Sequence, residues 1–228
     1  GMHVSYGKAM DFDGGAYGVA VLSRWPIERA QTHRLPGQAG REPRVALETQ
    51  VRAGRDGPSV SFFCTHWDHQ LSADRLRQAR RLAELSQQAK GDLVVLAGDF
   101  NDSPAGESVK HLLKTFEDAA AKKRPMLSCP ADKPTIQIDH ILYRSDRKVR
   151  AVDATVLDEA VASDHRPVLA VLEVATKSAP AASPGPNPSN ARTGGQFDRV
   201  TGCEHFAFLR ARMSEGLGGP ARQAAKSA

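Results

Sequence analysis

The most constraining stretch of this chain is an apolar run that ends in a cluster of polar side chains. The run extends from Leu93 to Ala97 and includes two β-branched valines. This composition predicts a strand buried on both faces, like the central strand of a layered α/β sheet. Asp99, Asn101 and Asp102 follow almost at once. Because polar groups are costly to bury without partners, the pattern indicates either an Asx-rich turn that caps the next helix or a binding site.

The charge of the chain is unevenly distributed. The net charge is +5, but residues 176–228 carry seven basic and three acidic side chains, which leaves 24 basic and 23 acidic side chains in residues 1–175. The part that contains the polar cluster is therefore nearly neutral, and its charge does not indicate a polyanion partner. Three scattered cysteines exclude a disulfide framework or a cysteine zinc site. No segment has the length and apolarity of a transmembrane helix.

The composition divides the chain into three parts. We expect one globular domain over residues 1–175, a Pro/Ala/Ser-rich linker over 176–196 and a basic C-terminal tail over 197–228. Within the tail, the spacing of apolar residues over 203–213 is that of a short helix, which would be marginal alone.

Local patterns predict several elements within the globular domain. The segment between Pro26 and Arg44 has loop composition. Asp13-Gly14-Gly15 is typical of a hairpin turn. The expected elements are a hairpin over 6–23, strands over 44–51 and 60–66, a helix over 72–90 capped by Ser72, a helix that begins at Ser103-Pro104, and strands over 136–143, 149–157 and 168–174.

Four polar motifs stand at the ends of these predicted strands. They are Thr65-His66, Gly98–Asn101, Asp139-His140 and Ser163–Pro167. Each alone has an ordinary structural explanation, because a Thr-His pair is commonly a hydrogen-bonded core histidine and Ser-Asp-His can cap a turn. All four motifs in this order, each beside an apolar strand, indicate one shared functional site.

With these motifs, residues 6–175 resemble the endonuclease/exonuclease/phosphatase superfamily. This superfamily consists of magnesium-dependent phosphoesterases similar to deoxyribonuclease I. The most specific parts of the resemblance are Gly98–Asn101 and Ser163–Pro167. The resemblance implies an α/β fold, a four-layer sandwich of two mainly antiparallel sheets packed face to face, with outer helices and the site at one end. It implies a hydrolase: a phosphodiesterase, nuclease or phosphatase. The substrate class stays open between nucleic acid, an inositol phosphate and a phospholipid headgroup.

The resemblance also implies catalytic roles for five residues. Asp99 orients or deprotonates the attacking water, and Asn101 holds a phosphate oxygen beside it. His165 hydrogen-bonds the scissile phosphate, while Asp139 fixes the tautomer of His165 and supports its positive charge. His66 is a second imidazole that faces the phosphate.

Two further residues complete the expected site. Asp164 is the carboxylate on the side of the metal, which we expect to be Mg²⁺ or Mn²⁺. Arg44 is expected to bind substrate near the phosphate, with a surface salt bridge as the alternative.

The sequence departs from the family pattern on its N-terminal side. The family has an asparagine on an N-terminal strand and a metal-binding glutamate on the next strand, whereas the hairpin that should follow them begins here near residue 6. We therefore expect a domain without these strands, weak metal binding, and an unpaired sheet edge through which the chain could self-associate. The alternative function is a catalytically impaired binding or interaction module. The compartment stays open between cytoplasmic and secreted with a leader removed.

Overall fold

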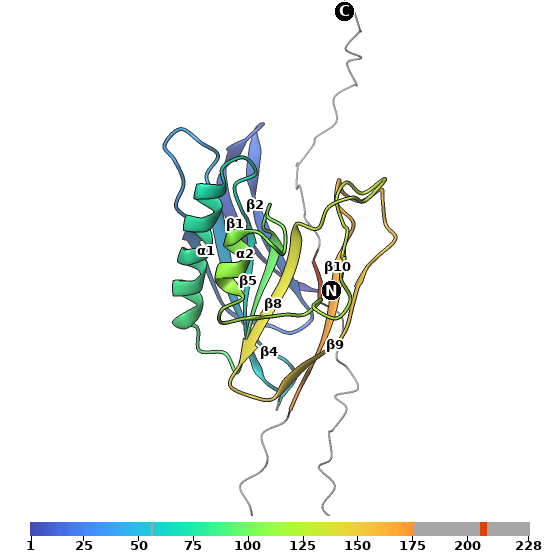
Figure 1. The fold of residues 1–228 in the computed structure, drawn as a ribbon. Helices are drawn as coiled ribbons and strands as arrows, with labels where there is room; N and C mark the ends of the chain where they lie inside the picture. Colours follow the sequence, from blue (N-terminus) through green and yellow to red (C-terminus); the bar gives the residue numbers. More distant parts are fainter. Residues whose placement is uncertain (56, 176–205, 209–228) are drawn as a thin grey trace, which may run out of the picture.

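The computed structural model describes residues 1–55, 57–175 and 206–208, and Figure 1 shows their arrangement. The strands are β1 (His3–Phe12), β2 (Gly15–Ser23), β3 (Ile27–Arg34), β4 (Val45–Arg52), β5 (Ser59–His66), β6 (Leu93–Asp99), β7 (Glu117–Asp118), β8 (Asp139–Ser145), β9 (Val149–Val156), β10 (Val168–Val174) and β11 (Phe206–Phe208). The helices among the described residues are α1 (Ser72–Gln87) and α2 (Glu107–Leu112).

The largest sheet has six strands in the order β3-β4-β5-β6-β8-β7. Strands β5 and β6 are parallel, and the other neighbours in this sheet are antiparallel. Every residue of β6 is buried. The prediction from its apolar run, a central strand covered on both faces, is therefore confirmed.

Alternate residues of the central strands contribute to two separate cores, because successive side chains of a strand point to opposite faces. Phe63, Leu96 and Leu142 belong to the core that the helices cover. Cys64 and Ala97 belong to the other core, which includes residues of β2, β9 and β10. The six-stranded sheet thus has helices on one face and a second sheet on the other.

Figure 1 shows this layered arrangement, with α1 and α2 on one side of the large sheet and β9 and β10 on the other. The second sheet has the order β11-β10-β9, and both of its strand pairs are antiparallel. Two mainly antiparallel sheets packed face to face confirm the expected fold class. Within the described residues the outer helices cover the larger sheet alone, and no described helix is long and apolar enough to span a membrane.

The N-terminal hairpin is confirmed as the separate two-stranded ribbon β1-β2. Asp13 and Gly14 occupy its turn with φ values of 48° and 73°. Two successive positive φ angles suit a two-residue hairpin turn, which explains the Asp-Gly sequence. The ribbon packs against β3, β4 and β5 and so reaches the large sheet.

The structure corrects two expectations about strands. The segment expected to be a loop after Pro26 contains β3, an edge strand whose side chains are mostly exposed and polar, so it lacks an apolar alternation. Residues 206–208 form β11 against β10 instead of part of a helix, because the free edge of β10 offers backbone hydrogen-bond partners to an extended segment. The linker 176–196 and the rest of the tail lie outside the described residues.

Both helices begin differently from the prediction. In α1 the N-cap is Leu71, not Ser72, and the Asp68 carboxylate accepts hydrogen bonds from the backbone N–H groups of Gln70 and Leu71. The second helix begins at Glu107, because a turn that includes Pro104 precedes it.

Candidate active site

Strand register places three of the expected catalytic residues side by side. His66 at the end of β5 is the parallel partner of Asp99 at the end of β6, and Asp99 is the antiparallel partner of Asp139 at the start of β8. Neighbouring strands lie about 4.8 Å apart, so the three residues form one row across the sheet. The row lies two residues beyond Ala97, which faces the core between the two sheets. The candidate site therefore stands at one end of the sandwich.

His165 reaches this row from the second sheet. It lies just before β10, and its Nδ1–H donates to Asp139 Oδ2 over 2.9 Å. The same carboxylate oxygen accepts a hydrogen bond of 2.6 Å from Ser128 Oγ. All three side chains are buried. The Asp139–His165 contact thus joins the two sheets where they meet at the site.

A second carboxylate–imidazole pair lies at the ends of β5 and β6. His66 Nε2 is 3.3 Å from Asp99 Oδ2. The other oxygen of Asp99 accepts a hydrogen bond of 2.9 Å from the backbone N–H of Asn101. Asp99 is 2% exposed. The protein therefore holds this buried carboxylate in one orientation between an imidazole and a backbone amide.

The backbone geometry of the Gly98–Asn101 segment explains why glycine and asparagine occupy its two ends. Gly98 has a φ of 148°, and a Cβ there would overlap the carbonyl oxygen of Thr65 on β5. Asn101 has a φ of 48°, in the left-handed region that asparagine tolerates better than most residues. These two positions let the chain turn directly after Asp99.

The Asn101 side chain ties this turn to the loop after β5. Its Nδ2 donates to the carbonyl oxygen of Trp67 over 3.0 Å, and the Trp67 N–H donates to the carbonyl oxygen of Asp99. The Trp67 ring stacks on Phe100 with ring centroids 4.2 Å apart. In this structure Asn101 therefore supports the loops behind the site, and its expected contact with a phosphate oxygen stays a prediction.

Arg44 lies behind the site and not on its surface. It is 3% exposed, so its salt bridge with Glu42 is largely buried, and its expected contact with substrate stays a prediction. Its Nη1 is 3.1 Å from Glu42 Oε1 and donates to the hydroxyl of Tyr17 over 3.4 Å, while Nη2 donates to His69 Nδ1. Tyr17 OH in turn lies 3.0 Å from His66 Nδ1. Arg44 is thus connected to His66 through Tyr17.

Asp164, the expected metal-side carboxylate, is exposed beside His165. Its Oδ1 accepts a hydrogen bond from Ser163 Oγ, and its backbone carbonyl accepts one from Ala131 N–H. Among the described residues no three His, Cys, Asp or Glu side chains converge on one point where a metal ion could be held. Mg²⁺ keeps several waters and needs only one or two carboxylates, so this donor chemistry fits a loosely held, largely hydrated ion.

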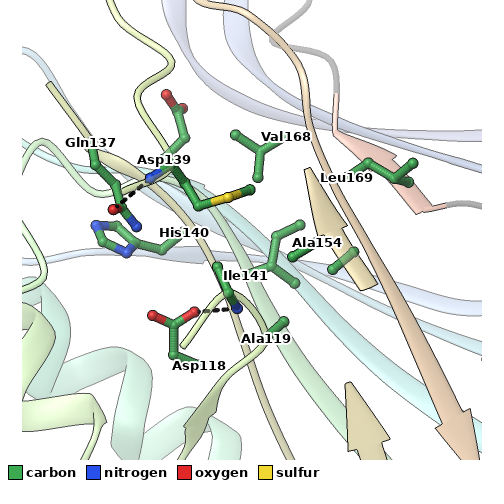
Figure 2. A pocket seen from close by; sticks show the side chains of 12 residues that line it. Asp118, Ala119, Gln137, Asp139, His140, Ile141, Ala154, Val168 and Leu169 are labelled. Carbon is green, nitrogen blue, oxygen red and sulfur yellow. Dashed lines mark hydrogen bonds between the residues drawn. The ribbon is translucent and has the colours of Figure 1, made fainter. Parts of the chain in front are cut away.

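The small cavity near the site belongs to the packing behind it. Figure 2 shows Gln137 and His140 on one side of this cavity and Val168 and Leu169 on the other. Its volume of about 10 Å³ is close to the minimum for one water molecule and excludes a substrate. Asp139 also lines this cavity, which therefore lies directly beside the site.

His140 is a structural residue beside that cavity. Its Nε2–H donates to the carbonyl oxygen of Asp102 over 2.8 Å, and its ring lies 5.3 Å from that of Phe100. Burial lowers the pKa of His140, although the Asp102 carbonyl partly opposes this effect. His140 is therefore neutral at pH 7.

Asp68 is an ionised anchor at the edge of the site. Burial opposes its charge, but the N–H groups of Leu71 and Gln70 and the Arg41 guanidinium outweigh it, so the pKa of Asp68 lies below its usual value. Arg41 Nε is 3.3 Å from Asp68 Oδ2. This carboxylate fixes the loop between His66 and α1.

Two residues of the site have no counterpart among the sequence predictions, Tyr17 and Ser128. Tyr17 shares a strand face with Val19 and Val21, which pack on the inter-sheet core, so alternation along β2 could have indicated an inward-facing tyrosine. Ser128 lies in an irregular segment, and only the folded chain brings it to Asp139.

Comparison with known proteins agrees with this geometry. A family model described as the endonuclease/exonuclease/phosphatase family matches residues 3–165. The uncharacterized protein YbhP of Escherichia coli K12 is 28% identical over 182 residues, which cover 75% of this chain and 68% of YbhP.

Solved structures show the same fold. The mannosyl-6-phosphatase Bt3783 of Bacteroides thetaiotaomicron gives a TM-score of 0.63 at 21% identity, over 74% of this chain and 76% of that chain. The catalytic domain of human Nocturnin with bound sulfate gives 0.60 at 19% identity, over 76% of this chain and 73% of that chain. With the family model matching residues 3–165, the chain belongs to the endonuclease/exonuclease/phosphatase family.

Proposed function

We propose that this chain hydrolyses phosphoester bonds at the end of the sandwich where the two sheets meet. Members of its family are generally hydrolases that act on phosphoester bonds, usually with divalent metals. The observation that carries the proposal is the pair of carboxylate–imidazole contacts, His66–Asp99 and His165–Asp139, whose two carboxylates are neighbours at the sheet end. The substrate could be a phosphomonoester or a phosphodiester, and the experiment below separates these.

The proposed reaction divides the work between the two pairs. Asp99, fixed by the Asn101 N–H and facing His66, orients the attacking water and takes its proton. As the water oxygen bonds to phosphorus, the P–O bond to the alcohol breaks, and the alkoxide leaves and takes a proton from solvent. Asp139 accepts the Nδ1–H of His165, so Nε2 is the nitrogen that meets the phosphoryl oxygen. A rigid arrangement of this kind lowers the barrier by positioning the reactants and by stabilising charge that develops on the phosphate.

Asp164 is the residue that would hold a metal ion in this proposal. Bound there, Mg²⁺ or Mn²⁺ would supply positive charge to the phosphoryl group. The exposed carboxylate suits an ion that keeps most of its waters, so we expect weak binding.

The test is hydrolysis of bis(p-nitrophenyl) phosphate and of p-nitrophenyl phosphate with millimolar Mg²⁺ or Mn²⁺. We expect the wild type to hydrolyse at least one ester and His165→Ala to lower kcat by about 10²–10⁴. His3→Ala is the matched control, because His3 is exposed on β1, and it should change kcat by less than about twofold.

Two outcomes would contradict the proposal. If His165→Ala kept kcat within about tenfold of the wild type, the assigned site would be wrong. If the wild type bound phosphate but hydrolysed neither ester, the alternative of a binding module would account better for the same residues.

A further inference from the structure

Tyr17 connects the N-terminal ribbon to the imidazole of the proposed site. Its hydroxyl lies 3.0 Å from His66 Nδ1, and Arg44 Nη1 donates to it over 3.4 Å. The ring of Tyr17 also contacts the ring of Phe12 at the tip of the ribbon, with centroids 6.3 Å apart. The hydroxyl is thus placed between a buried cation and a catalytic candidate.

The direction of each contact follows from which groups can donate. A guanidinium only donates, so the Tyr17 oxygen accepts from Arg44. A neutral His66 that accepts the Tyr17 hydrogen at Nδ1 carries its own hydrogen on Nε2. Nε2 is the nitrogen that lies 3.3 Å from Asp99 Oδ2. In this form every hydrogen along the path faces an acceptor.

The other neutral tautomer fits the same positions poorly. It would direct the Nε2 lone pair at the Asp99 carboxylate, which is also an acceptor. It would also make His66 Nδ1–H the donor to the Tyr17 oxygen, so the Tyr17 hydrogen would have to turn away from His66. The Asp99 carboxylate therefore favours the Nε2–H tautomer of His66, and the Tyr17 hydroxyl, as a donor to Nδ1, supports the same tautomer.

We propose that Tyr17 is a positioning residue of this site, which holds His66 in the Nε2–H tautomer and directs that hydrogen to Asp99. The inference rests on the proposed function for its effect on catalysis, but the tautomer can be measured without it. Tyr17 acts through His66, so removing its hydroxyl should change kcat more than KM. Without the Tyr17 hydroxyl, His66 no longer directs its Nε2–H to Asp99 in every molecule, and the Asp99 carboxylate is held in place less firmly.

The test uses Tyr17→Phe, which removes the hydroxyl and keeps the ring. Long-range ¹H–¹⁵N NMR of the histidine rings should show the Nε2–H tautomer of His66 in the wild type and a mixture of tautomers in the variant. We expect kcat to fall by about tenfold with KM within about twofold. Tyr143→Phe is the matched control, because it removes a hydroxyl that donates to Glu117 and should leave the His66 signals unchanged.

A double-mutant cycle decides whether the effect passes through His66. If it does, Tyr17→Phe should change kcat by less than about twofold in a His66→Ala background. An Nδ1–H tautomer in the wild type, unchanged His66 signals in Tyr17→Phe, or a full tenfold effect without His66 would each overturn the inference. If the wild type hydrolyses no ester, the proposed function fails, while the NMR result still decides the role of Tyr17.

Discussion

At the scale of single residues, the candidate site combines fixed carboxylates with imidazoles whose second nitrogen has a defined partner. Asp139 holds Nδ1 of His165, and Tyr17 lies at Nδ1 of His66. A third histidine, His140, lies directly beside Asp139 but donates to a backbone carbonyl behind the site. Neighbouring histidines therefore have different roles, which the direction of each hydrogen bond defines.

His140 should make the stability of the protein depend on pH. Burial lowers its pKa in the folded state, so below the unfolded value of about 6.5 the unfolded chain binds more protons than the folded chain. The contribution of neutral His140 is fully present above pH 6.5 and is lost as the pH falls from there toward the lowered pKa, by up to about 1.4 kcal/mol per pH unit.

Urea unfolding of the wild type and of His140→Gln between about pH 7.5 and 5 tests this dependence. The free energy of unfolding should fall less steeply with decreasing pH in the variant. His3→Gln, at an exposed position, should keep the wild-type slope. Equal slopes in the wild type and His140→Gln would show that His140 is not kept neutral by burial.

At the scale of elements, the strands that carry the site were the easiest to predict. Strands β5, β6 and β10 each contain an apolar run, and each has a polar motif at or next to one end. Strand β3 could not be predicted, because an edge strand with exposed polar side chains has no alternation to detect. Tyr17 and Ser128 were missed for a different reason, since they meet His66 and Asp139 only through tertiary contacts.

The close approach of β5 and β6 at the site predicts a strong effect of Gly98→Ala. A Cβ at Gly98 would overlap the Thr65 carbonyl, and the positive φ of 148° is unfavourable for alanine. We expect the free energy of unfolding to fall by about 3 kcal/mol or more, because backbone atoms of a central strand must move. Gly40→Ala is the control, because Gly40 lies in a loop with open space around it. We expect this variant to lose stability only because alanine is unfavourable at the positive φ of Gly40. A loss for Gly98→Ala no larger than for this control would contradict the packing described.

At the scale of the whole molecule, the site is shared between the two sheets of the sandwich. The large sheet supplies His66, Asp99 and Asp139, and the segment that leads into β10 supplies Asp164 and His165. The site therefore requires both sheets to be packed together. Self-association through a sheet edge stays a prediction, which the mass of the protein in solution would test.

Weak metal binding is expected from the same arrangement. With an exposed Asp164 and no described convergence of three acidic or imidazole side chains, millimolar Mg²⁺ should raise Tm by about 1 °C or less. Thermal melts with Mg²⁺, with Mn²⁺ and with a chelator measure this shift, and Asp164→Asn should abolish any that occurs. A shift of several degrees that survives Asp164→Asn would place the metal on other residues.

In the proposed mechanism, Asp99 prepares the water that attacks the phosphoester. The most direct measurement is kcat of Asp99→Asn for the ester that the wild type hydrolyses, beside the matched variant Asp146→Asn. Asp146 is exposed after β8, at the end of that strand opposite Asp139. We predict that Asp99→Asn lowers kcat by about 10²–10⁴ in a protein that remains folded, whereas Asp146→Asn has the wild-type rate. A folded Asp99→Asn protein with kcat within about tenfold of the wild type would contradict the claim.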